Sequence, residues 1–383
     1  MIDNKRFLDV LLKCGVEFFT GVPDSYLNGF CTCLMDSVPE EKNVVAANEG
    51  NAIAIAAGYF LSTGRVALVY MQNSGVGNAI NPILSLAAKV VYSVPMVLLI
   101  GWRGEPGTKD HAQHMLQGKL TTRFLELMEI PYCIAENDND LLEKQTEELI
   151  RLAQQNRTPV AIVARKGVFA LDEKSTEPEE NGYPLFREEA ILAVLDALPP
   201  DTIYVATTGR ASRELFFLRE KRGEGHQHDF LNVGAMGHAS SVALGLALGN
   251  KDRRVVCLDG DSALLMHMGS LSTVSRLGVP NFLHIVLNNG AHDSVGGQPS
   301  AGMSVDLSAI ARGAGYETVG HPVATPDGIA EAIRILTSRR KPGFLDVRVK
   351  KGLRGKLPPL GVSSYVRLAD ELMQNLLKAR RES

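Results

Sequence analysis

Short apolar runs of strand length alternate with helix-like segments along most of the chain. In the first half these runs cover residues 66–71 and 94–101, and in the second half they cover 255–258 and 279–286. Strands that are apolar at nearly every position are buried on both faces, as in parallel sheets covered by helices. The pattern therefore predicts an α/β fold with parallel sheets flanked by helices.

The same order of segments occurs twice. A helix-like segment of small residues over 51–58 precedes the first run, and a similar segment over 238–245 precedes the run 255–258. In both halves a Val-Pro pair then introduces the next apolar run, and Pro ends the helix before it. We expect two similar domains, over 1–171 and 185–383, the second ending in a polar helix over 370–383.

The two halves are joined by an acidic segment over 172–184, DEKSTEPEENGYP, which has no apolar periodicity and is predicted to be an exposed linker. The formal net charge of −3 gives no basis for a nucleic-acid-binding protein. No apolar run is long enough for a membrane span, and the N-terminus predicts an amphipathic helix and no signal peptide. Five scattered cysteines indicate reduced thiols, so we expect a cytoplasmic protein.

Polar clusters follow two of the predicted strands in the second half. The run 255–258 is followed by DGDSA at 259–263, and the next run ends in Asn288-Asn289-Gly290. Ligands of open parallel sheets bind beyond the carboxyl ends of the strands. A carboxylate, an amide oxygen and a backbone carbonyl suit Mg²⁺, and N–H groups at a helix start attract phosphate. Taken alone, Asp261 and Ser262 could instead merely cap a helix, a less favoured alternative.

This arrangement resembles the GDG…NN motif of thiamine diphosphate (ThDP)-dependent enzymes, with Ser262 where the family usually has Gly. The resemblance implies that ThDP and Mg²⁺ are the cofactors. It also implies that the metal is bound by the side chains of Asp261 and Asn289 and by the Ala291 carbonyl. The implied diphosphate contacts are Thr207, Thr208, Gly209, Gly260, Asp261, Ser262, Ala263 and Asn289.

Two further segments resemble this family. NEGNAIA at 48–54 is similar to its glutamate motif, which implies that Glu49 interacts with N1′ of the cofactor's aminopyrimidine. VGAMGH at 233–238 is similar to an element in which Met236 props the two cofactor rings and the Gly234 carbonyl accepts from the 4′-amino group. By themselves, Glu49 could be a charge favoured in the first turn of a helix and Met236 a core residue.

The segments 18–25, FFTGVPDS, and 289–299 are similar to those of phosphonopyruvate decarboxylases and, more distantly, of sulfopyruvate decarboxylases. Both are two-domain members of the family, without the central third domain of many relatives. The resemblance implies decarboxylation of a small anionic 2-oxoacid, 3-phosphonopyruvate, to phosphonoacetaldehyde and CO₂ in phosphonate biosynthesis, on the way to 2-aminoethylphosphonate. It also implies a homo-oligomer with active sites at the subunit interface.

A dianionic substrate requires cations and hydroxyl or amide donors. The loop 101–114 follows a predicted strand and carries Arg103, Lys109, His111 and His114. Asp24 and Ser25 are further candidates, and His292 and Asp293 could help to transfer the final proton. The expected catalytic residues are Glu49, Asp24, His111 and His292, and the expected substrate ligands are Ser25, Arg103, Lys109 and His114. For each loop residue, a solvated surface role is an open alternative.

Other functions remain open at this stage. Within the family, a sulfopyruvate decarboxylase or another ThDP-dependent decarboxylase or carboligase would use the same motifs. Outside it, GVGN at 75–78 suggests a nucleotide-binding module, but the segment lacks the third glycine of the dinucleotide fingerprint. ThDP binding would separate the enzyme from the nucleotide-binding module.

Overall fold

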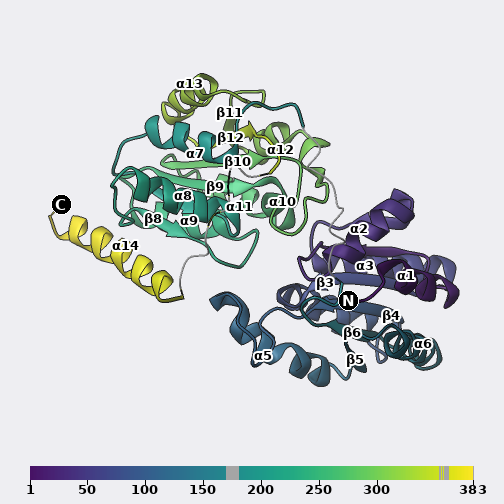
Figure 1. Cartoon of the computed structure of the whole chain (residues 1–383). Helices are drawn as coiled ribbons and strands as arrows, with labels where there is room; N and C mark the ends of the chain where they lie inside the picture. The colour runs from purple at the N-terminus through teal and green to yellow at the C-terminus, as the bar shows by residue number, and fades with distance from the viewer. Residues whose placement is uncertain (170–180, 353–354, 356, 358–361, 383) are drawn as a thin grey trace. The chain divides into compact units, whose positions relative to one another are not determined.

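The computed structural model describes residues 1–169, 181–352, 355, 357 and 362–382, and it divides the chain into two compact units, Met1–Thr176 and Glu177–Ser383. Figure 1 shows an α/β unit in each half. The segment predicted as a linker lies mostly outside the described residues. No helix in the described ranges is long and apolar enough to cross a membrane.

The first unit contains a six-stranded parallel sheet in the order β2-β1-β3-β4-β6-β5. Its strands are β1 Phe19–Gly21, β2 Asn43–Val45, β3 Ala67–Gln72, β4 Met96–Gly101, β5 Tyr132–Ala135 and β6 Val160–Ala164. Its helices are α1 Asn4–Lys13, α2 Asn28–Ser37, α3 Glu49–Thr63, α4 Val76–Pro82, α5 Ala112–Leu127 and α6 Asn139–Asn156, with the short turns η1 Glu40–Lys42, η2 Asn73–Gly75 and η3 Ile83–Ala87.

The second unit contains another six-stranded parallel sheet, in the order β11-β12-β10-β9-β7-β8. Its strands are β7 Ile203–Ala206, β8 Asp229–Leu231, β9 Val255–Gly260, β10 Phe282–Asn288, β11 Glu317–Thr318 and β12 Gly343–Arg348. Its helices are α7 Arg187–Asp196, α8 Arg210–Lys221, α9 Ala239–Gly249, α10 Asp261–Met266, α11 Ser270–Leu277, α12 Leu307–Ala314, α13 Pro326–Thr337 and α14 Val362–Glu382, with the turn η4 Ala301–Met303.

The strand order confirms the predicted repeat. Read from its other edge, the second sheet runs β8-β7-β9-β10-β12-β11, which matches the first sheet strand for strand. Two units of one topology present their strand ends in the same way, so corresponding loops of each unit lie at the same edge of its sheet.

Each sheet is covered by a hydrophobic core on both faces. Along β3, Leu68 and Tyr70 belong to the core under α1, α2 and α6, whereas Ala67, Val69 and Met71 belong to the core under α3, α4 and α5. Successive residues of a strand point to opposite faces. The second sheet alternates likewise, with Val256 and Leu258 in one core and Val255 and Cys257 in the other. Burial on both faces is the reason why these strands are apolar at nearly every position.

One element bound differs from that predicted, and one helix at the strand ends is short. The C-terminal helix begins at Val362, eight residues before the polar segment from which it was predicted, because Leu368 and Leu372 pack against the second unit. The helix that opens at Asp261 has only 6 residues, Asp261–Met266.

Candidate active site

The residues predicted to bind metal and diphosphate lie at one edge of the second sheet. β9 ends at Gly260 and β10 at Asn288, and the two strands are paired in parallel with Leu287 opposite Gly260. Asp261 and Asn289 therefore leave neighbouring strands side by side. The carboxyl end of β7 lies next to β9, with Ala206 opposite Leu258, and it leads into Thr207, Thr208 and Gly209.

Asp261 is almost completely buried and accepts a hydrogen bond from Ser300 Oγ. Burial raises the pKa of its carboxyl group to about 6, because the charged form loses hydration. Gly302 packs directly against this carboxylate, and a Cβ atom there would overlap Asp261. A cation bound beside the Asp261 carboxylate would stabilise its charged form in place of the water that burial excludes.

Asn289 is also buried, and hydrogen bonds fix both ends of its amide. Its Nδ2 donates to Asp293 Oδ2 at 2.6 Å, and its Oδ1 accepts from the backbone N–H of Ala291 at 3.1 Å. An amide oxygen has two lone pairs, so one remains available for a metal ion. His292 follows Ala291, and burial lowers the pKa of its imidazole to about 4.

Two buried hydroxyl groups at this edge have no hydrogen-bond partner among the described residues. They are Thr207 Oγ1, after β7, and Ser262 Oγ, after β9. Buried polar atoms normally find a partner, and a ligand is one way to provide it. A diphosphate with a divalent cation would supply acceptors for both hydroxyls and a charge for Asp261, so the residues present fit such a group.

The Met236 segment forms an irregular loop between β8 and α9. Ala235 and Gly237 both have positive φ angles, 47° and 85°. A side chain at Gly237 would meet the His267 ring at 2.6 Å, so only Gly fits there. Met236 is half-buried, and Ala263 of the neighbouring α10 is buried. His267, whose ring centroid lies 4.4 Å from that of His238, was not predicted.

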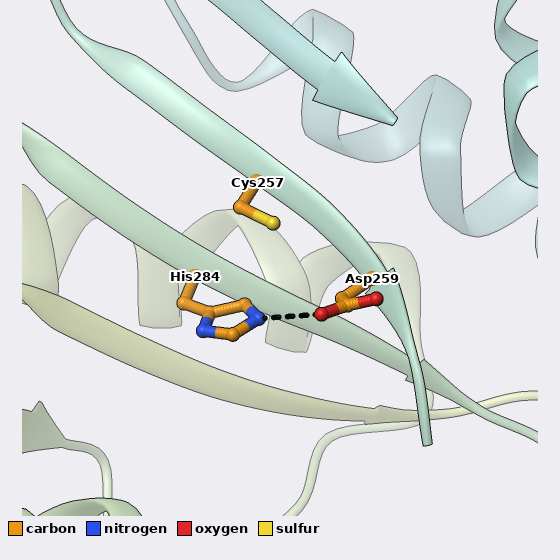
Figure 2. Close-up of side chains that lie close together, drawn as sticks. All are labelled: Cys257, Asp259 and His284. Atoms are coloured by element: carbon orange, nitrogen blue, oxygen red, sulfur yellow. Dashed lines mark hydrogen bonds and ion pairs between the residues drawn. The ribbon is translucent and has the colours of Figure 1, made fainter. Parts of the chain in front are cut away.

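A buried polar cluster supports the strand end from within the sheet (Figure 2). Cys257, Asp259 and His284 lie on β9 and β10, with their ligand-type atoms within 4.8 Å of one another. His284 Nε2 lies 3.1 Å from Asp259 Oδ2, and Asp259 Oδ1 accepts from the Gly260 N–H at 3.0 Å. Burial raises the pKa of the Cys257 thiol well above its usual range, so the sulfur stays protonated. The cluster is therefore a hydrogen-bonded support for Gly260.

In the first unit, Glu49 begins α3 and is buried, with 5% of its surface exposed. Its Oε2 accepts from Asn78 Nδ2 at 2.8 Å. Gly75 packs against the glutamate side chain, and a Cβ at Gly75 would overlap its carboxylate. The weak nucleotide-loop segment 75–78 thus has another role, since its first and last residues hold Glu49.

Asp24 lies where β1, β3 and β4 end, and it is fully buried. Its Oδ1 accepts from Gln72 Nε2 at 2.6 Å, and its Oδ2 accepts from the backbone N–H of Tyr26 at 2.9 Å. Burial raises the pKa of this carboxyl group. A Cβ at Gly101 would overlap Asp24, so the glycine at the end of β4 makes room for it. The first unit therefore has a buried acid that can hold a proton.

The loop after β4 is organised around Asp110, which sequence reasoning missed. Arg103 donates to it through Nε at 2.8 Å and through Nη2 at 2.6 Å, while Nη1 donates to Ser25 Oγ at 3.0 Å. Burial would raise the pKa of Asp110, but hydrogen bonds from Arg103 and from the His111 N–H hold it well below its usual range. Much of the Arg103 charge is thus neutralised within the loop. Lys109 is exposed, His111 is half-buried and His114 is buried.

Comparison with known proteins fits this arrangement. Two family models match the chain: the N-terminal TPP binding domain of thiamine pyrophosphate enzymes, over residues 4–124, and the C-terminal TPP binding domain, over 208–347. Thiamine pyrophosphate is another name for ThDP. Phosphonopyruvate decarboxylase from Streptomyces viridochromogenes is 35% identical over 92% of this chain and 89% of the relative. The chain belongs to the thiamine diphosphate-dependent 2-oxoacid decarboxylases.

Two more relatives match about nine-tenths of this chain. The phosphonopyruvate decarboxylase of Streptomyces hygroscopicus is 34% identical over 92% of this chain and 88% of the relative. The sulfopyruvate decarboxylase of Methanosarcina acetivorans is 26% identical over 91% and 92% of the two chains. The family and ThDP as its cofactor, both predicted from the motifs, are confirmed, and the matched family models are those of two ThDP-binding domains.

Gly75 offers a test of how the decarboxylase holds Glu49. A Gly75→Ala variant should lose at least about tenfold in kcat, because the added methyl group displaces the glutamate. Gly77→Ala is the matched control, since a Cβ at Gly77 meets nothing within 4 Å. Steady-state kinetics of both variants would check this. Equal activity of the two would show that Gly75 does not position Glu49.

The stability of the first unit should depend on the protonation of His114. Burial first, and then the nearby Arg103 charge, lower the pKa of His114 from 6.5 to about 4. Between these values the unfolded chain binds a proton that the folded unit excludes, so stability falls as pH decreases from 6.5 to 4. We expect a loss of about 2 kcal/mol by pH 4.5 that a His114→Gln variant does not show.

Unfolding of this unit can be followed separately, because the one tryptophan of the sequence, Trp102, is buried beside Arg103. Urea titrations monitored by Trp102 fluorescence at pH 7 and 4.5 would give the free energy of unfolding for both proteins. The same pH dependence in wild type and variant would contradict the assignment to His114.

Proposed function

We propose that this decarboxylase converts 3-phosphonopyruvate into phosphonoacetaldehyde and CO₂, with Mg²⁺ as the metal that binds the ThDP diphosphate. The observation that carries the proposal is the identity of 34–35% to two phosphonopyruvate decarboxylases, over about nine-tenths of each chain. A match over nine-tenths of the chain includes most of both units. The product aldehyde would serve phosphonate biosynthesis, including that of 2-aminoethylphosphonate.

In this proposal the second unit holds the cofactor diphosphate. Mg²⁺ binds the side chains of Asp261 and Asn289 and the Ala291 carbonyl. The Thr207 and Ser262 hydroxyls, both buried without a partner among the described residues, donate to diphosphate oxygens. The remaining proposed contacts are Thr208, Gly209, Gly260 and Ala263 to the diphosphate, and Gly234 and Met236 to the rings. Glu49 contacts N1′ of a cofactor bound across the interface of a homo-oligomer.

When bound, ThDP supplies the carbon nucleophile and accepts the electrons that CO₂ leaves behind. The protein has to orient the substrate and deliver one proton to the product carbon. Asp24 suits the proton transfer because burial raises its pKa, so that it holds a proton more readily than an ordinary aspartate. His292, with its pKa lowered to about 4, is neutral at pH 7 and would act as a hydrogen-bond donor.

The phosphonate group requires positive charge and hydroxyl donors near the first unit's strand ends. Lys109 and His111 lie on the loop after β4, and Ser25 Oγ lies in contact with Arg103. Because Arg103 is paired with Asp110, we assign it to shaping the loop as well as to binding the substrate. Lys109, which is exposed, is then the cation that we assign to the phosphonate, with His111 and His114 following it in the chain.

The test is ³¹P NMR of 3-phosphonopyruvate incubated with the protein, ThDP and Mg²⁺. A phosphonoacetaldehyde signal that requires all three would support the proposal. Sulfopyruvate is assayed in parallel for CO₂ release, because the relative from Methanosarcina acetivorans is a sulfopyruvate decarboxylase that matches 91% of this chain. Turnover of sulfopyruvate with none of 3-phosphonopyruvate would replace the proposed substrate by the sulfonate.

A further inference from the structure

Asp293 lies close to the proposed metal site, and its side chain is 9% exposed. Its Oδ2 accepts from Asn289 Nδ2 at 2.6 Å and from the Gly352 backbone N–H at 3.1 Å. Arg187 Nη1 lies 3.5 Å from the same oxygen. Three donors therefore converge on Oδ2, which leaves no room for an acid proton on that oxygen. This geometry suits a fixed acceptor better than a group that delivers a proton.

The contact with Asp293 decides which way the Asn289 amide points. An ionised carboxylate can only accept hydrogen bonds, so the amide must turn its NH₂ group toward Asp293. Its oxygen then points to the opposite side, where it accepts from the Ala291 N–H at 3.1 Å. If the amide were reversed, the Asn289 oxygen would face the Asp293 carboxylate, which is also an acceptor. The NH₂ group of Asn289 would then point toward the metal.

A second layer of buried charge holds Asp293 in turn. Arg187, the first residue of α7, forms a two-pronged pair with Glu214 of α8, through Nε at 2.8 Å and Nη2 at 3.0 Å. The side chains of Arg187, Glu214 and Asp293 are 9%, 5% and 9% exposed. In addition, Arg210 Nη2 donates to the Asp293 backbone carbonyl at 2.7 Å. Two helices thus anchor the residue that orients Asn289.

We propose that Asp293, held by Arg187 and Glu214, is a positioning residue for metal binding: it fixes the Asn289 amide with its oxygen toward the metal. The inference rests on the proposed function, in which Asn289 binds Mg²⁺.

The experiment measures metal affinity directly. Mn²⁺, used in place of Mg²⁺, is titrated into protein with excess ThDP, and free Mn²⁺ is followed by electron paramagnetic resonance. Asp293→Ala should raise the Kd for Mn²⁺ by about 10- to 100-fold, the usual effect of losing a group that orients a metal ligand. Asp293→Asn can still accept a hydrogen bond from Asn289, so its Kd for Mn²⁺ should lie between those of wild type and Asp293→Ala.

Turnover distinguishes positioning from proton transfer. At saturating ThDP, kcat of Asp293→Ala on 3-phosphonopyruvate should be reduced at limiting Mg²⁺ and should recover as Mg²⁺ is raised, because excess metal overcomes the weaker site. A proton donor would behave in the opposite way, with kcat reduced by about 100-fold or more and the Mn²⁺ Kd unchanged. An unchanged Kd for Mn²⁺ in Asp293→Ala, whether kcat is reduced or unchanged, would overturn the inference.

Controls separate this test from other failures. Asp252→Asn changes an exposed aspartate of the same unit and should leave the Mn²⁺ Kd unchanged. If Asp293→Ala does not fold, as judged by thermal melting, the isosteric Asp293→Asn carries the test. A wild-type protein that binds Mn²⁺ with ThDP but does not turn over 3-phosphonopyruvate would refute the proposed substrate alone. A wild type that binds no Mn²⁺ would refute the metal site and this inference together.

Discussion

Replacing Glu49 by Gln is expected to lower kcat by about a thousandfold while ThDP and Mg²⁺ still bind. The family resemblance gives this residue the contact with N1′ of the aminopyrimidine, a contact in which a carboxyl group shares a proton. Gln has the same shape and can still accept from Asn78 Nδ2, which now lies 2.8 Å from Glu49 Oε2. It can neither give nor take the proton, so binding and catalysis should separate.

The measurement pairs isothermal titration of ThDP, in the presence of Mg²⁺, with the rate of CO₂ release. Glu41→Gln is the control, because Glu41 is an exposed glutamate of the same unit, in the turn η1. Wild-type kcat in Glu49→Gln would remove Glu49 from the proposed mechanism. Loss of ThDP binding together with activity would show that the residue mainly holds the cofactor.

Much of the fold was predictable because strands that are buried on both faces are apolar at nearly every position. Continuously apolar runs marked β3, β4, β9 and β10, the four central strands, and the repeated order of segments gave two units of one topology. Short edge strands were harder to predict. β11 has only two half-buried residues, Glu317 and Thr318, so it carries no clear pattern.

Candidate site residues were predictable where a strand end fixes their position. Asp261 and Asn289 follow adjacent parallel strands, so their closeness follows from the pairing of β9 with β10. His284 could also have been noticed, as a histidine within an apolar strand that needs a buried partner. That partner, Asp259, lies on the neighbouring strand.

Residues whose partners depend on loop conformation were not predictable. Asp110 lies seven residues after Arg103, and only the turn between them brings the two charges into contact. Asp293 was considered for proton transfer from its position in the sequence. Its contact with Arg187, 106 residues away, depends on how α7 packs near α8. Gly75 and Asn78 resembled part of a nucleotide loop, and their contact with Glu49 arises from the packing of α4 against α3.

The second large effect is expected at Asp261. Cofactor that binds only the folded protein stabilises it by RT ln(1 + [L]/Kd), or about 2.7 kcal/mol at a hundred times Kd. Asp261→Asn removes the charged oxygen from the proposed metal site, so most of this stabilisation by ThDP and Mg²⁺ should disappear. In differential scanning fluorimetry, ThDP and Mg²⁺ should raise the Tm of wild type and have little effect on the Tm of Asp261→Asn.

Gly302→Ala should displace the Asp261 carboxylate and leave its charge unchanged. The added Cβ would overlap Asp261 and press on Asn288, so the cofactor-dependent rise in Tm should shrink in this variant too. Gly313→Ala, in α12, is the matched control, because a Cβ there meets nothing within 4 Å. If both Asp261→Asn and Gly302→Ala kept the full rise in Tm, the metal would have to bind elsewhere. If only Asp261→Asn lost it, the charge of Asp261 would matter more than its position, since the two variants differ in that respect.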